Sequence, residues 1–209
     1  MDKLYWEILD GERIKIVPIF SSFKDDFYLA GGTALALQIG HRYSNDFDFF
    51  TKNSFSSWEL FKKLKEVFVG LKMVKVQEEK DTLTVLIDEK IKISFFGYPY
   101  DLIEPVIKTE FINLASVEDI GAMKLSAITG RSVLKDYVDL YWIIQKIGLL
   151  KLTKVCQKKY KDLDINLVLK SLVYFEDIIK EPIIYKNFGE VSFDEIKSYL
   201  RKTVNSYLN

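Results

Sequence analysis

The chain has 209 residues, enough for one good-sized domain or two small ones that share an interface. Hydrophobic residues make up 48% and charged residues 29%, which excludes disordered and fibrous proteins. Thirty basic residues balance thirty acidic ones, so the chain lacks the basic excess typical of proteins that bind along a nucleic-acid backbone. Binding of nucleic acid through a local basic patch stays an open alternative.

The first residues and the apolar segments of the sequence argue against secretion and against membrane insertion. Residues 1–6 lack the basic segment and uninterrupted apolar run of a secretory signal. No stretch approaches the roughly 18 apolar residues that a membrane span needs. We therefore expect a cytoplasmic protein without a membrane partner. The single cysteine, Cys156, cannot form an internal disulfide and is predicted to be a buried thiol.

A strand, a glycine turn and a short helix are predicted after an amphipathic opening that ends near Phe23. Residues 27–30 form a compact apolar run that stops at Gly31 and Gly32. Residues 33–39 contain good helix formers, and Gly40 ends that segment.

Residues 45–50 are predicted to form a strand with two different faces. Phe47 and Phe49 alternate with Asp46 and Asp48. Because side chains alternate across a strand, both carboxylates should point the same way.

The following segments predict a mixed sheet and then a helical region. Residues 56–68 have the capping start and apolar face of a helix, and the β-branched and aromatic segments 73–76, 82–87 and 90–96 read as strands. From about Ser116 the patterns are helical, over 117–129, 132–147, 152–160, 165–179 and 192–208. The aromatic residues Tyr174, Phe175 and Tyr199 fall at core-like spacing and are predicted to pack.

These elements predict an α+β fold with a small mixed sheet and a helical C-terminal region. The boundary is expected between Asp101 and Ser116, where Pro105 punctuates the chain. Residues 1–112 then form the sheet-containing core, and residues 113–209 form the helical region that completes its cleft.

The pair Asp46 and Asp48 indicates a metal site. Two carboxylates on one face of a strand lie roughly 6 to 7 Å apart at their Cα atoms, a gap that one divalent ion can bridge. Mg²⁺, or the similar Mn²⁺, takes one or two protein carboxylates and completes its shell with water and substrate phosphates. The pair therefore favours a nucleoside triphosphate (NTP) as the companion ligand.

The turn Gly31-Gly32-Thr33 supplies a complementary feature. Glycines between a strand and a helix let backbone amides approach an anion, and the helix N-terminus adds favourable potential. Either motif alone is usually structural, but here a phosphate cradle and an acidic strand follow one another in the order that a nucleotide site needs.

Three sequence blocks together resemble a known family. They are the run from Leu29 to Phe50 with its Gly-Gly-Thr and Asp-Phe-Asp motifs, the block Met123-Lys124-Leu125-Ser126-Ala127, and the block from Arg131 to Tyr141. In this order they resemble the AbiEii/AbiGii-type nucleotidyltransferase toxins of bacterial abortive-infection systems, within the polymerase-beta-like nucleotidyltransferase superfamily. The resemblance spans about residues 28 to 142.

The resemblance implies that a nucleoside monophosphate is moved from an NTP to an acceptor, as the toxin half of a toxin and antitoxin pair. Asp46 and Asp48 would hold Mg²⁺, Lys124 would bind the triphosphate, and Asp136 matches the acidic residue of the final motif. The remaining residues expected to contact the nucleotide are Gly31, Gly32, Thr33, His41, Arg42, Ser44, Arg131, Lys135 and Asp139. The acceptor would be RNA, including a tRNA end, a protein or a small molecule.

One departure from the family pattern concerns a third carboxylate, which such enzymes usually carry on a later strand. The strand expected at 90–96 has Ser94 there. A hydroxyl is a poorer metal ligand and is no general base at neutral pH. Asp136 would have to compensate from the helical side.

Several alternatives stay open at this point. His41 and Arg42 also fit a structural hydrogen bond or ion pair, and Lys124, Lys135, Asp136 and Asp139 also fit a solvated helix face. Ser94 favours an inactive nucleotidyltransferase-like module that binds a nucleotide or a partner. A third hypothesis is a sugar-nucleotide transferase that uses Asp-X-Asp, which the glycine turn makes less favourable.

Overall fold

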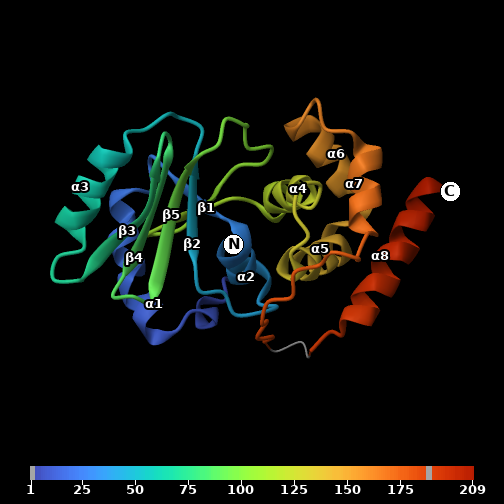
Figure 1. Ribbon diagram of the computed structural model, residues 1–209, viewed down its shortest axis with the longest axis horizontal. Coiled ribbons are helices and arrows are strands. Elements are labelled where there is room, and N and C mark those ends of the chain that lie inside the picture. The colour runs from blue at the N-terminus through green and yellow to red at the C-terminus, as the bar shows by residue number, and fades with distance from the viewer. Residues whose placement is uncertain (1–2, 187–189) are drawn as a thin grey trace. The chain divides into compact units, whose positions relative to one another are not determined.

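The computed structural model describes residues 3–186 and 190–209 (Figure 1). Two compact units emerge from its packing. The first, which we name the sheet unit, comprises the chain up to Ile39, Ser44–Asp101 and Pro105–Ala115. The second, the helical unit, comprises Gly40–Tyr43, Leu102–Glu104 and the chain from Ser116 onward.

The sheet unit is built on a seven-stranded mixed sheet with the order β3-β4-β5-β2-β1-β7-β6. Its strands are β1 (Tyr28–Ala30), β2 (Phe47–Thr51), β3 (Met73–Glu79), β4 (Thr82–Ile87), β5 (Ile91–Gly97), β6 (Ile107–Lys108) and β7 (Asn113–Leu114). The pairs β2/β5 and β1/β7 are parallel, and the other neighbours are antiparallel. The predicted mixed sheet is therefore confirmed.

Short helices flank this sheet. They are η1 (Trp6–Ile8), α1 (Gly11–Ile16), η2 (Val17–Ser22), α2 (Gly31–Ile39) and α3 (Ser57–Val67). Asp10 and Ser56 cap α1 and α3 by accepting backbone N–H bonds in the first turn. Helix α3 packs on β3 and β4 (Figure 1).

One face of the sheet is aromatic and buried. Phe47 and Phe49 of β2 are 0% and 1% exposed, and both rings lie 4.9 Å from the ring of Phe20. Phe95 of β5 stacks on Phe49 at 5.2 Å and contacts Phe23. Because side chains alternate along a strand, this core directs Asp48 to the opposite face.

The helical unit contains α4 (Val117–Ala127), α5 (Leu134–Ile147), α6 (Leu149–Lys159), α7 (Ile165–Leu172) and α8 (Phe193–Leu208). Helix α4 packs against α5, α6 and α7, and α8 packs against α5, α6 and α7. At Gly121 of α4 a Cβ atom would lie 2.6 Å from Leu152 Cδ1 of α6 and 3.0 Å from Ile143 Cγ2 of α5, so both side chains pack closely on this glycine. The mixed α/β architecture agrees with the expected fold class.

Helix α7 is shorter than the sequence predicts. It ends at Leu172, not near residue 179, and the backbone carbonyls of Ser171 and Tyr174 both accept hydrogen bonds from the Tyr137 hydroxyl, at 3.1 and 3.0 Å. The chain turns to make these contacts. Tyr174 is consequently 47% exposed, with its hydroxyl donating to Asp177, so the predicted packing role of Tyr174 is wrong.

Cys156 lies in α6 and is fully buried, as predicted. Burial raises the pKa of its thiol to about 12, so the unreactive protonated form prevails at neutral pH.

None of the helices in the described ranges combines the length and the apolar character that a membrane span requires.

Candidate functional site

The glycine turn and the acidic strand meet in the sheet unit. Strands β1 and β2 are antiparallel neighbours with Ala30 opposite Asp48, and α2 starts at Gly31 directly after β1. Gly31 has a φ of +66°, and a Cβ atom there would lie 3.0 Å from the Asp48 carboxylate oxygen Oδ2. Both the backbone conformation and the approach of Asp48 therefore call for glycine. The structure places the carboxylate beside the first residue of α2.

Thr33 contacts the segment from Ser44 to Asp46, which leads into strand β2. Its hydroxyl hydrogen-bonds the backbone carbonyl of Asp46 and lies 2.8 Å from the Ser44 hydroxyl. The residue is 2% exposed, whereas Gly32 is only partly buried. Thr33 thus has a structural partner in this arrangement, and its expected contact with a phosphate stays a prediction.

Asp46 and Asp48 occupy different structural settings. Strand β2 begins at Phe47, so Asp46 lies just before the strand and not within it as predicted. The Asp46 side chain is 48% exposed, and its Oδ2 lies 2.9 Å from Nζ of Lys92 on β5. Asp48 is partly buried within β2. Two carboxylates with access to solvent are hard oxygen donors of the kind that Mg²⁺ prefers.

Ser94 lies directly opposite Asp48 in the parallel pair β2/β5. It is 3% exposed, and its hydroxyl lies 3.3 Å from that of Thr84 on β4. No cluster of three or more His, Cys, Asp or Glu side chains suited to a metal occurs in the part of the chain that the structure describes. One or two carboxylates are the ordinary protein contribution to a Mg²⁺ site, so the oxygen donors of Asp46 and Asp48 have the chemistry to hold such an ion.

Arg13 of α1 is a site residue that sequence reasoning missed. Its guanidinium donates from Nε to the carbonyl of Asn45 at 2.6 Å and from NH2 to the carbonyl of Lys90 at 2.9 Å. These residues directly precede Asp46 and strand β5. Arg13 is 7% exposed, yet a single arginine beside Ile14 and Lys15 looks like surface in the sequence. It aligns the starts of the two strands that carry polar site residues.

A second group of predicted residues meets inside the helical unit. Lys124 of α4 places Nζ 2.8 Å from Asp136 and 2.6 Å from Asp139, which lie three residues apart on α5. Asp139 also accepts hydrogen bonds from Arg42 at 2.7 and 2.9 Å, and His41 Nε2 lies 2.7 Å from its Oδ1. We name these five residues the charged cluster. All are buried, so Lys124, Asp136 and Asp139 do not form the solvated helix face that was the alternative for them.

The electrostatics of the charged cluster follow from burial and pairing. Burial alone would raise the pKa of Asp139, but Arg42 and Lys124 outweigh it and hold this pKa well below 3.8. The pKa of Arg42 is raised because Asp139 outweighs the effect of its burial. Burial lowers the pKa of His41 below 6.5 despite the bond to Asp139. His41 is therefore neutral at pH 7, and its buried Nδ1 has no hydrogen-bond partner among the described residues.

Arg131 and Lys135 lie at the border of this cluster. Nε of Arg131 donates to Asp136 at 3.0 Å, while the side chain is 62% exposed and so available to a ligand. Lys135 instead pairs with Glu181 at 2.8 Å. The structure thus joins Arg131 to the cluster and gives Lys135 a separate partner.

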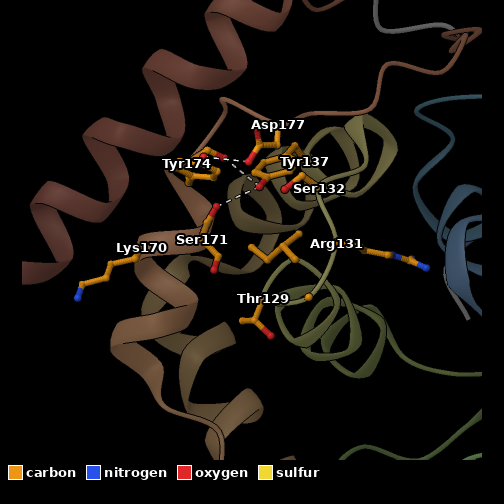
Figure 2. A pocket seen from close by; sticks show the side chains of 10 residues that line it. Thr129, Arg131, Ser132, Tyr137, Lys170, Ser171, Tyr174 and Asp177 are labelled. Carbon is orange, nitrogen blue, oxygen red and sulfur yellow. Dashed lines mark hydrogen bonds between the residues drawn. The ribbon is translucent and has the colours of Figure 1, made fainter.

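A hollow of about 410 Å³ with a mixed polar and apolar lining opens beside Arg131 in the helical unit. Hydroxyl groups of Ser132, Tyr137, Ser171 and Tyr174 lie around it, and Figure 2 shows the Arg131 guanidinium turned away from these hydroxyls. This direction agrees with its bond to Asp136. Arg131 therefore lines the hollow, while its guanidinium contacts the charged cluster.

Comparison with known proteins gives consistent results. Residues 19–202 match the model of the family described as nucleotidyl transferase AbiEii toxin, type IV toxin-antitoxin (TA) system. An uncharacterised protein of Aquifex aeolicus is 40% identical over 191 residues, which cover 88% of this chain and 89% of the relative.

Among solved structures, the mycobacterial nucleotidyltransferase toxin MenT4 (Mycobacterium tuberculosis H37Rv) shares the fold with a TM-score of 0.53 and 17% identity, over 91% of this chain and 80% of that one. A candidate nucleotidyltransferase of H. pylori gives 0.50 and 14%, over 98% and 99%. The match to the family model over most of the chain shows that this protein belongs to the AbiEii nucleotidyltransferase toxin family.

Proposed function

We propose that the protein transfers a nucleoside monophosphate from an NTP to an acceptor with the help of Mg²⁺ or Mn²⁺. The acceptor is an RNA, such as a tRNA end, or a protein. In the cytoplasm the protein acts as the toxin of a pair, and a cognate antitoxin is its partner. The membership of the AbiEii family supports the reaction class, and the geometry of the two units supports the roles of individual residues.

The observation that carries this proposal is the approach of Asp48 to Gly31. The Asp48 carboxylate lies 3.0 Å from the position of a Cβ atom on Gly31, the first residue of α2, so the proposed metal ligand lies next to the first backbone amides of that helix. A triphosphate seated on α2 would therefore have its phosphates beside Asp46 and Asp48. The divalent ion, when bound there, neutralises phosphate charge and orients the reacting phosphoryl group.

The charged cluster supplies cations for the same substrate. Lys124 is held by two carboxylates and Arg42 by one, so both side chains are fixed before any ligand arrives. Fixed charges need no reorganisation during reaction, which is how electrostatic stabilisation becomes effective. We assign Lys124 and the exposed Arg131 to the phosphates, with Asp136 and Asp139 as their positioning residues. His41, Lys135 and Ser44 stay predicted nucleotide contacts.

The covalent chain links the two groups of residues. Only Tyr43, Ser44 and Asn45 separate Arg42 from Asp46, so their Cα atoms lie no more than about 14 Å apart, given at most 3.6 Å per residue. The proposal assigns both groups to one reaction because both lie in the part of the chain that matches the family.

The proposed step conserves atoms and electrons. An acceptor oxygen or nitrogen donates an electron pair to the α-phosphorus, and the bond from that phosphorus to the oxygen bridging to the β-phosphate breaks. Pyrophosphate leaves with the electron pair of the broken bond, and the proton of the acceptor passes to water. The chain contributes positioning and charge, which dominate catalysis of phosphoryl transfer.

Ser94 favours a second candidate, a module that binds nucleotide without transfer. Its hydroxyl occupies the place opposite Asp48, where a third carboxylate would hold another ion. The module would bind NTP with no pyrophosphate release.

Incubation with each α-labelled NTP, Mg²⁺ and either total RNA or a protein extract tests the proposal. Label should pass to one fraction with the wild type and with Asp25→Ala, which changes an exposed carboxylate of the sheet unit. It should not pass with the double variant Asp46→Ala/Asp48→Ala. Nucleotide binding without transfer in the wild type would instead establish the inactive module.

A further inference from the structure

We propose that Lys92 is a further residue of the transfer site. Its ammonium group supplies a second positive charge beside a single divalent ion held by Asp46 and Asp48. Two-metal enzymes obtain that charge from a second ion, which stabilises one of the two oxygens of the displacement. This inference rests on the proposed function and deepens it.

The register of β2 and β5 places Lys92 on the acidic face. Asp48 lies opposite Ser94, and Phe47 lies opposite Ile93. Lys92 is two residues before Ser94, so the two side chains share a face of the sheet. Nζ of Lys92 lies 2.9 Å from Asp46 Oδ2, and its side chain is 45% exposed. Lys92 thus combines a contact to a proposed metal ligand with access to solvent.

The charge of this face fits one ion better than two. Two carboxylates and one ammonium leave a single formal negative charge, whereas a third carboxylate in place of Ser94 would double it. Ser94 is buried against Thr84, so its hydroxyl adds no anionic ligand. Two divalent ions on this face would repel each other and the ammonium group, with only two carboxylates to compensate. With one divalent ion, the two carboxylates and Lys92 leave a net charge of about +1, which attracts the phosphates.

The pairing of Lys92 with Asp46 is more than a chance meeting of two surface side chains. Isolated exposed ion pairs are weakly held because both side chains are flexible. Here the buried Arg13 binds the carbonyls of Asn45 and Lys90, which fixes the backbone just before Asp46 and two residues before Lys92. The two side chains therefore start from aligned positions.

An ammonium group can carry part of the role of a metal ion. It offers three hydrogen-bond donors and no acceptor, so it suits a phosphoryl or attacking oxygen that gains negative charge. No proton moves through Lys92 in this role. Lys92 positions Asp46 and stabilises developing charge, whereas the carboxylates bind the ion.

The test counts bound Mn²⁺ by electron paramagnetic resonance in the presence of a non-hydrolysable NTP analogue, alongside the labelled transfer assay. The variants are Lys92→Met, which keeps the stem and removes the charge, and Lys92→Met/Ser94→Asp, which adds a third carboxylate. Lys72→Met is the matched control, because Lys72 forms an exposed ion pair with Glu89 elsewhere in the sheet unit.

We expect one Mn²⁺ per chain in the wild type and in Lys72→Met. Lys92→Met should bind its ion two- to tenfold more tightly, since no ammonium competes for Asp46, yet transfer should fall about 100-fold, the usual effect of removing one stabilising donor. The double variant should bind two ions. A merely structural lysine would lower metal affinity and transfer together.

Two Mn²⁺ per wild-type chain, or full transfer activity in Lys92→Met, would overturn the role of Lys92 while leaving the proposed function intact. No transfer by the wild type with any NTP would defeat the proposed function instead. In that case the Mn²⁺ count and the affinity change in Lys92→Met still decide whether Lys92 shares the site with a single ion.

Discussion

Asp139 makes most of the polar contacts in the charged cluster of the helical unit. It is fully buried and faces His41, Arg42 and Lys124. Asp139→Asn would leave two buried cations under-compensated, so we expect a loss of about 3–5 kcal/mol in unfolding free energy at pH 7, measured by urea denaturation. The control is Asp194→Asn, because the Asp194 side chain is 89% exposed. This substitution should change the unfolding free energy by less than about 1 kcal/mol.

The same variant should reveal the pH dependence of this contribution. The pKa of Asp139 is well below 3.8 in the folded protein, so on acidification the unfolded chain binds its proton first. Its stabilising contribution is thus complete above the unfolded value and is lost as pH falls towards the folded one. The difference between wild type and Asp139→Asn should therefore shrink below about pH 4. A constant difference down to pH 2.5 would contradict the assignment.

The stability of the protein should also depend on pH through His41. The chain contains only this histidine, so no other imidazole contributes to the effect. Its pKa is lowered from 6.5 by burial, so near pH 6 the unfolded chain binds a proton that the folded protein does not. Stability should consequently rise between pH 5.5 and 7.5, by at most about 1.4 kcal/mol per pH unit. Melting temperatures across this range should show the rise in wild type and a flatter profile in His41→Gln. Equal profiles would show that His41 does not titrate as inferred.

Helix α1 acts on the site through one side chain. Arg13 binds two backbone carbonyls that precede β2 and β5, one through Nε and one through NH2 of its planar guanidinium. Arg13→Met should lower the unfolding free energy by about 2 kcal/mol in urea denaturation, since two part-buried hydrogen bonds from a charged donor are lost. It should also weaken Mn²⁺ binding severalfold, because the alignment of Asp46 is lost. Lys15→Met, on the exposed part of the same helix, should change neither quantity.

The elements that the sequence predicts well are those with a long pattern. The strand expected at 82–87 coincides with β4, and the helix expected at 192–208 differs from α8 by one residue, because alternation and capping signals are strong there. Strands β6 and β7 have two residues each, too few for any periodicity, and are held by a turn that Thr109 organises through bonds to Ile112. Tertiary contacts from Tyr137 shortened α7, which local sequence cannot encode.

The candidate site also contains a part that local sequence patterns predict and a part that depends on tertiary contacts. The placement of Asp48 beside Gly31 could be predicted from the sequence. It depends on a strand, a glycine turn and an antiparallel neighbouring strand that lie close together in the chain. The burial of Lys124, Asp136 and Asp139 against His41 and Arg42 requires residues about 100 positions apart to meet, and only the family resemblance pointed to them. Arg13 and Lys92 carried no signal, because a charged residue near a strand or helix end is usually solvent-exposed.

For the molecule as a whole, the proposal requires residues from both units in one reaction. The carboxylates belong to the sheet unit and Lys124 to the helical unit, so loss of either set should abolish transfer and hence toxicity. Induced expression of the wild type and of Asp25→Ala should arrest bacterial growth. Asp46→Ala/Asp48→Ala and, separately, Lys124→Met should relieve it at equal protein levels checked by immunoblot.

The two variants change different units, which makes their agreement informative. Lys124→Met removes the cation that Asp136 and Asp139 share and leaves them only Arg131 and Arg42, so its melting temperature must be measured to confirm that the protein is folded at the growth temperature. The acidic pair is partly exposed, and its removal should leave the melting temperature nearly unchanged. Arrest that persisted in both folded variants would show that toxicity comes from binding a cellular component and not from nucleotide transfer.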